Sequence, residues 1–125
     1  MTIAEAGEKY GLSADTLRYY ERIGLIPPVN RTRGGKRDYT EADCRWIEFI
    51  KCMRGAGLAV EVLIEYVSLF QKGDSTRNAR KAILIDQREK IAGRTAELQK
   101  TLDRLDAKIA RYDTALLAAE KNLFP

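Results

Sequence analysis

The stretch LSADTLRYYE, residues 12–21, decides the fold, because it reads as a short helix with an abrupt start. Ser13 can cap this helix with its hydroxyl, and Asp15 places a negative charge in the first turn, where the helix dipole favours it. Residues 3–10 form a second short amphipathic segment, and Gly11 supplies the turn between the two. Two short helices around a glycine-containing turn predict a helix-turn-helix.

A basic hairpin is predicted directly after this helix. The residues GLIPP, 24–28, end the helix, and RTRGGKRDY, 31–39, places a Gly-Gly turn between basic residues. Such a turn is typical of a two-stranded hairpin. Thr40 then caps a further helix that has Glu41 in its first turn.

The composition suits a small DNA-binding protein. The 125 residues carry a formal net charge of +4, and residues 10–37 alone hold six basic and two acidic residues. A charge run by itself is more often a solvated surface, but beside a helix-turn-helix it predicts contacts with DNA phosphates. There is no secretory signal and no apolar run that could span a bilayer, so we expect a cytoplasmic protein without a membrane partner.

The residues argue against an enzyme, a metal site and a cofactor. The chain has no histidine, and we find no pair of catalytic carboxylates and no phosphate-binding loop. Cys44 and Cys52 are about 12 Å apart along one predicted helix, which is too far for one metal ion or an intrachain disulfide. We therefore expect no catalysis, no metal and no cofactor.

The chain after Thr40 has a wholly helical pattern. Apolar spacing predicts helices over residues 40–54 and 59–72, and a long last helix that Asp74 or Ser75 caps. Apolar side chains recur along that last helix in a heptad pattern: Leu84, Ile91, Leu98, Leu105 and Tyr112, with Leu102, Ile109 and Leu116 between them.

This heptad stripe predicts a partner helix. The remaining domain is too small to bury the stripe, so a two-fold homodimer with a coiled coil is the expected solution. The alternative is that the helix folds back on its own domain. We divide the chain into a DNA-binding domain with connecting helices, residues 1–73, and a dimerisation helix with a short tail, residues 74–125.

These features together resemble the MerR family of bacterial transcription regulators. The resemblance lies in LS at 12–13, TLRYYE at 16–21, GLIP at 24–27, GG at 34–35, Arg37 and YT at 39–40. It implies a mainly all-α fold: a winged helix-turn-helix domain with a two-strand wing, then a long helix in an antiparallel coiled coil. It also implies that the partners are double-stranded promoter DNA with an over-long spacer and RNA polymerase. Lys36 departs from the pattern, since many members carry an aromatic residue there.

The second helix and the wing hold the expected DNA contacts. Arg18 and Tyr19 are the first candidates for groove and phosphate contacts, and Tyr20 is either a supporting contact or a core residue under the wing. Basic wing residues would hold the flanking backbone or the minor groove. The full expected set is Ser13, Thr16, Arg18, Tyr19, Tyr20, Arg33, Lys36, Arg37 and Tyr39.

The two cysteines receive different interpretations. Cys44 has the spacing of a small core residue. Cys52 lies between Lys51 and Arg54, whose charges favour a thiolate, although its place near a helix C-terminus disfavours one.

A subgroup resemblance supports a role for Cys52. The stretches WIEFIKCMR (46–54), GDST (73–76) and AELQKTLD (96–103) resemble the NmlR/AdhR subgroup, which responds to electrophiles such as aldehydes. The resemblance implies Cys52 as the sensor in a stress response. Little sequence follows the last helix, so we expect neither a separate ligand-binding domain nor a drug-sensing role. The alternative is a regulator of the same fold with no small-molecule or thiol input.

Overall fold

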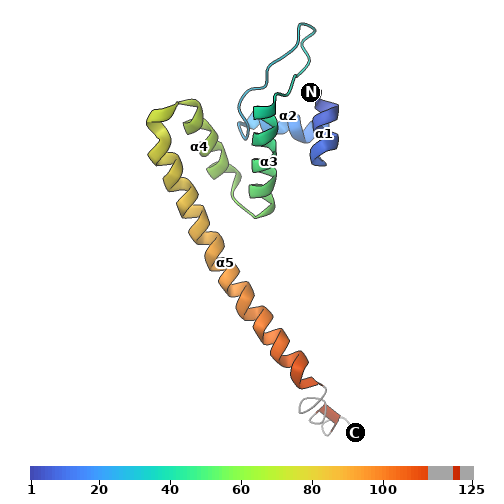
Figure 1. The fold of residues 1–125 in the computed structure, drawn as a ribbon, viewed down its shortest axis with the longest axis vertical. Coiled ribbons are helices and arrows are strands. Elements are labelled where there is room, and N and C mark those ends of the chain that lie inside the picture. The colour runs from blue at the N-terminus through green and yellow to red at the C-terminus, as the bar shows by residue number, and fades with distance from the viewer. Residues whose placement is uncertain (113–119, 122–125) are drawn as a thin grey trace. The chain divides into compact units, whose positions relative to one another are not determined.

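The computed structural model describes residues 1–112 and 120–121 (Figure 1). Its helices are α1 (Ile3–Tyr10), α2 (Ala14–Ile23), α3 (Glu41–Gly55), α4 (Val60–Gln71), the 3-10 helix η1 (Asp74–Thr76) and α5 (Arg77–Arg111). The chain forms two compact units, Met1–Gln87 and Arg88–Pro125, so α5 contributes to both. The functional division at residue 73 stays a prediction. Within the described residues no helix has the length and apolarity that crossing a membrane requires.

Side-chain caps define the helix-turn-helix and the start of α3. The amide of Thr16 donates to Ser13 Oγ at 3.0 Å, and the amide of Asp43 donates to Thr40 Oγ1 at 3.1 Å. Gly24 ends α2 with a φ of +85°, a left-handed conformation that favours glycine. These two hydrogen bonds confirm the helix starts, and the conformation of Gly24 confirms the stop, that the sequence predicted.

The core of the first unit lies where α1 contacts α2 and α3. Leu17 of α2 and Ile47 of α3 are fully buried there. Gly7 of α1 permits the close approach, because a Cβ at this position would lie 2.6 Å from the backbone oxygen of Leu12. Gly11 then takes a φ of +65° at the predicted turn. The packing of these elements fixes the direction in which α2 presents its polar face.

The structure corrects the prediction of a two-strand wing. The structure assigns no strand to any residue it describes, and residues 30–38, here called the wing loop, contain one isolated β-bridge between Arg31 and Arg37. Backbone bonds join Thr32 to Lys36 and Asp38 to Asn30 across the loop. A ladder does not lengthen from there, because the next bonded pair in this register would join residues 28 and 40. Pro28 has no N–H to offer, and the amide of Thr40 donates to Asp43 Oδ2 at 2.8 Å.

The start of α5 also differs from the prediction. Asp74 and Ser75 do not cap it, because residues 74–76 form the 3-10 helix η1 and α5 begins at Arg77. The hydroxyl of Thr76 lies 2.7 Å from the backbone oxygens of Gly73 and of Leu69, which is in the last turn of α4. The chain therefore enters α5 through η1 and a side-chain bond back to α4, and not through the expected N-cap.

Aromatic side chains join α3 to α4. Trp46 packs edge-on against Phe70, with ring centroids 4.9 Å apart, and Phe49 lies 5.7 Å from Tyr66. Aromatic pairs in this geometry add to the stabilisation that area burial provides. They hold α4 beside the helix that follows the wing loop.

Candidate DNA-binding surface

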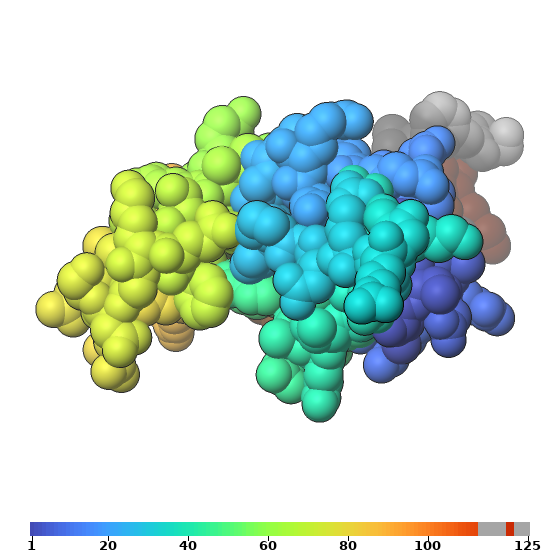
Figure 2. Space-filling view, turned by 90° about the horizontal axis from the view of Figure 1, so that it is seen from above, coloured from blue at the N-terminus to red at the C-terminus, as the bar shows by residue number. Residues whose placement is uncertain are grey.

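One face of the first unit combines α1, α2 and the wing loop. Seen from above, the blue atoms of α1 and α2 adjoin the cyan atoms of the wing loop in one continuous surface (Figure 2). The residues of this face come from separate parts of the chain, and the helix-turn-helix core holds them together. The face carries most of the side chains expected to contact DNA.

The polar side of α2 presents Arg18 and Tyr19. Arg18 is 47% exposed and its Nη1 lies 2.9 Å from Oδ1 of Asp15, one turn earlier. Tyr19 is exposed, and the guanidinium of Arg22 lies 5.5 Å from its ring centre. Both Arg18 and Tyr19 are therefore at the surface and able to reach a ligand without rearrangement of the core.

Ser13 and Thr16 lie at the start of the same helix. Their hydroxyl oxygens are 2.8 Å apart, and Ser13 also accepts from the amide of Thr16. Ser13 thus has a structural role as the cap. Its position at an exposed helix N-terminus also suits an approaching phosphate.

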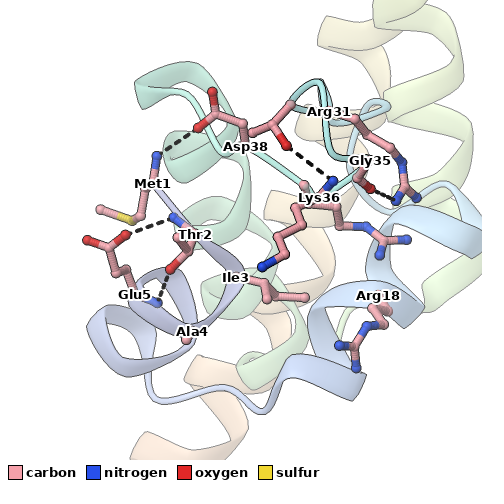
Figure 3. A pocket seen from close by; sticks show the side chains of 12 residues that line it. Met1, Thr2, Ile3, Ala4, Glu5, Arg18, Arg31, Gly35, Lys36 and Asp38 are labelled. Carbon is pink, nitrogen blue, oxygen red and sulfur yellow. Dashed lines mark hydrogen bonds and ion pairs between the residues drawn. The ribbon is translucent and has the colours of Figure 1, made fainter.

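A hollow of about 630 Å³ lies between the start of α1, α2 and the wing loop (Figure 3). Four basic residues contribute to its lining: Arg18, Arg31, Lys36 and Arg37. Figure 3 shows Lys36 extending toward Ile3 from the wing loop, and Arg18 entering from α2. Arg31 donates from Nη1 to the backbone oxygen of Gly35 at 2.9 Å, which braces the tip of the loop. Arg33 is exposed on the same loop.

Tyr20 and Tyr39 lie beneath this surface and not on it. Tyr20 is buried, and Tyr39 is only 2% exposed. Burial raises the pKa of both phenols. The Tyr39 hydroxyl makes no hydrogen bond to any residue that the structure describes. Tyr20 therefore takes the second of its two interpretations, that of a core residue under the wing, and packing leaves it 8% exposed. Tyr39 is covered as well, and its contact with DNA stays a prediction.

Arg37 is partly committed within the protein. Its Nε donates to Glu21 Oε1 at 2.6 Å, and the second carboxylate oxygen of Glu21 accepts from the amide of Val29 at 3.1 Å. Burial raises the pKa of Glu21, but these hydrogen bonds and the nearby guanidinium charges outweigh burial and hold the pKa below its usual value. No role for Glu21 was expected from the sequence. Its spacing of four residues from Leu17 is the signal for the inner face.

The two cysteines differ in accessibility. Cys52 is exposed and Cys44 is buried, with its Sγ 3.9 Å from the sulfur of Met1. The cations beside Cys52 in sequence have other partners: Lys51 donates to the backbone oxygen of Tyr10, and Arg54 donates to that of Leu58 at 2.6 Å. The described residues contain no cluster of three or more Cys, Asp or Glu that could hold a metal ion.

The predicted seam of α5 is open to solvent in the single chain. Leu84, Leu98, Leu102, Leu105, Ile109 and Tyr112 are exposed, and Ile91 is half-buried. Leu116 lies outside the described residues. Exposed side chains of this size at heptad spacing are available to a second helix.

Comparisons with known proteins point in one direction. Residues 1–69 match the family described as MerR HTH family regulatory protein, and residues 44–108 match the one described as MerR, DNA binding. The HTH-type transcriptional regulator AdhR of Bacillus subtilis (strain 168) is 60% identical over 91 residues, 73% of this chain and 65% of that protein. The chain thus aligns with less than two thirds of this relative's length.

Solved structures resemble this chain over most of its length. A candidate MerR family transcriptional regulator from Listeria monocytogenes is 50% identical, with a TM-score of 0.91 over 98% of this chain and 93% of its own. HiNmlR, a MerR family regulator that lacks the sensor domain and was solved bound to promoter DNA, is 34% identical. Its TM-score is 0.81 over 93% of this chain and 92% of its own.

Proposed function

The chain belongs to the MerR family of helix-turn-helix transcriptional regulators, and from this premise we propose that it binds promoter DNA as a homodimer through α2 and the wing loop. The observation that carries the proposal is the hollow that Arg18 of α2 lines together with Arg31 and Lys36 of the wing loop. Basic side chains that converge from two projecting elements suit a DNA backbone running between them. The DNA-bound state of HiNmlR supports the same use of this fold.

The proposed contacts divide into two kinds. Arg18 and Tyr19, with Thr16 beside them, act in the major groove and on its edges, where an arginine can read a guanine through two hydrogen bonds. Arg33 and Lys36 contact phosphates, which add affinity without sequence preference. Arg37 adds positive charge on the same loop while it is bound to Glu21.

The homodimer is proposed from the exposed seam of α5. Leu105 is 54% exposed in the single chain, and its neighbours one and two turns away are also open. A second α5, antiparallel as the family resemblance implies, covers these side chains. Two-fold symmetry then gives two α2 helices, which enter major grooves one or more helical turns apart on a near-palindromic operator.

Activation is proposed to work through DNA distortion. The dimer binds a promoter whose spacer is too long and bends or untwists it, so that RNA polymerase engages both promoter elements. Deformation of this kind costs several kcal/mol, and the wing-loop contacts with the backbone supply that energy.

Cys52 is the proposed electrophile sensor of this cytoplasmic regulator. Its support is accessibility, because Cys52 is exposed while Cys44 is buried. A modified Cys52 near the end of α3 would change how α3 leads into α4. A tenfold shift in the active population requires only about 1.4 kcal/mol.

A second candidate is a regulator of the same fold without a thiol input. The contacts of Lys51 and Arg54 favour it, since both cations donate to backbone oxygens, as the structure describes them. DNA binding and transcription that electrophiles leave unchanged would establish this second candidate.

The experiment that tests DNA binding is sequencing of the genomic fragments that the purified protein retains. We expect an enriched near-palindrome inside promoter spacers. Fragments without a shared sequence would contradict the proposal.

A further inference from the structure

We propose that Glu21 is a positioning residue for DNA binding, because one carboxylate joins α2 to both ends of the wing loop. The inference rests on the proposed function of the wing loop and deepens it. Glu21 itself contacts no DNA. It sets where the basic residues of the loop lie relative to Arg18.

Glu21 contacts the chain on both sides of the wing-loop tip. Its Oε2 accepts from the amide of Val29, directly before the loop, at 3.1 Å. Its Oε1 accepts from Nε of Arg37, near the end of the loop, at 2.6 Å. The residues between these two points include Arg31, whose own hydrogen bond goes to the loop tip. A single side chain on α2 therefore holds the loop where it leaves and where it returns.

The ion pair between Glu21 and Arg37 is largely buried. The side chains of Glu21 and Arg37 are 16% and 19% exposed. Solvent screens such a pair less than the exposed pair of Arg18 with Asp15. A hydrogen bond to a charged partner is also stronger than one between neutral groups. The link is therefore suited to hold a loop that has only one β-bridge of its own.

The negative charge of Glu21 lies on the helix that is proposed to contact DNA. Glu21 follows Arg18 by three residues on a helix that we propose to face phosphates. A carboxylate close to DNA opposes binding by simple electrostatics. Its removal would then tighten binding, unless the carboxylate has a positioning role that outweighs the repulsion. Repulsion alone predicts that removal of the charge lowers the Kd for DNA, whereas a positioning role predicts that it raises the Kd.

The decisive variant is Glu21→Gln, which keeps the size of the side chain and removes its charge. We expect its Kd for a promoter duplex selected by the wild-type protein to rise at least about tenfold, the effect of losing one charged hydrogen bond. The matched control is Glu41→Gln, the same substitution at an exposed ion pair of α3, and it should bind like wild type. Unchanged or tighter binding by Glu21→Gln would overturn the proposal.

A double-mutant cycle tests whether Arg37 acts through Glu21. We expect Arg37→Gln to weaken DNA binding. The double variant should have a Kd no higher than that of the single variant with the higher Kd, because both substitutions break the same ion pair between Glu21 and Arg37. Fold-changes that multiply would show that Arg37 contacts DNA independently, and would overturn this part. If Glu21→Gln fails to fold, Arg37→Lys decides: it keeps the charge but not the Nε geometry, so wild-type affinity contradicts the link.

Amide hydrogen exchange separates positioning from general stability. In Glu21→Ala, which leaves no acceptor at this position, the amide of Val29 should lose protection, while that of Leu25, which donates to the backbone oxygen of Tyr20, should keep it. Equal loss at both amides would mean global destabilisation and would contradict a positioning role. This readout requires no DNA. A wild-type protein that binds no promoter DNA would therefore refute the proposed function separately from the Glu21 link.

Discussion

Replacing Arg18 with alanine should impair DNA binding and leave folding nearly intact. The side chain is 47% exposed and its ion pair partner, Asp15, is 95% exposed, with 2.9 Å between Nη1 and Oδ1. An exposed pair of this kind contributes about 0.2–1 kcal/mol, so the free energy of unfolding should fall by less than about 1 kcal/mol. A lost base contact costs about 1–3 kcal/mol, so the Kd should rise roughly 5- to 150-fold.

Two titrations measure these quantities. Fluorescence anisotropy with a selected promoter duplex at physiological salt gives the Kd, and urea denaturation gives the free energy of unfolding. Arg45→Ala is the control, since Arg45 forms a similar exposed pair with Glu41, at 3.3 Å, on α3. Wild-type affinity in Arg18→Ala, or a loss no larger than that of Arg45→Ala, would refute the assignment of α2 as the recognition helix.

Four further predictions concern Lys36 in the wing loop, Leu105 in the α5 seam, the thiol of Cys52 and the carboxyl group of Glu21. Lys36→Ala should weaken binding to all sequences nearly equally and reduce the slope of log K against log salt by about one, as a salt series on two unrelated duplexes would show. Leu105→Asp should place an unpaired charge in the seam, so sedimentation should show a dimer of roughly 28 kDa, twice the 14.2 kDa of one chain, only for the wild type; a monomeric wild type at micromolar concentration would argue against the two-fold operator. A limiting thiol reagent should label Cys52 before Cys44, and Cys52→Ser should keep DNA affinity but lose the response of a reporter gene to electrophiles; preferential labelling of Cys44 would exclude the sensor. Because the folded pKa of Glu21 lies below its unfolded value, its stabilisation should be complete above about pH 4.3 and decline as the pH falls further, and urea titrations of Glu21→Gln should lack that part of the decline.

Local signals explain why most helices could be predicted from the sequence. Ser13 and Thr40 start helices with their own side chains, and Gly24 ends one with a φ that other residues rarely adopt. These features depend on a few neighbouring residues, so a single sequence contains them in full. The buried positions of Leu17 and Ile47 follow from the same helical spacing.

Long-range contacts explain what could not be predicted. The wing loop pairs with itself at one bridge, and the amide of Tyr39, just after the loop, pairs with Met1, a partner 38 residues away. Likewise, the sequence indicated that Arg37 was free for DNA, whereas the fold brings it against Glu21. The pattern around Thr76 gave no sign that its hydroxyl would reach back to α4. In each case a polar group bonds to a residue in another part of the fold, and the spacing of apolar residues in the sequence does not predict such a bond.

Site-directed DNA cleavage tests the central claim most directly, that two α2 helices of a homodimer read one promoter. An iron chelate attached to Asp15→Cys, at a 95% exposed position of α2 to which no DNA contact is assigned, in a Cys52→Ser background, cuts the DNA strands nearest to α2. We predict two clusters of cuts on the selected promoter duplex, one helical turn or a whole number of turns apart. One cluster alone, or cuts scattered along the duplex, would contradict the account.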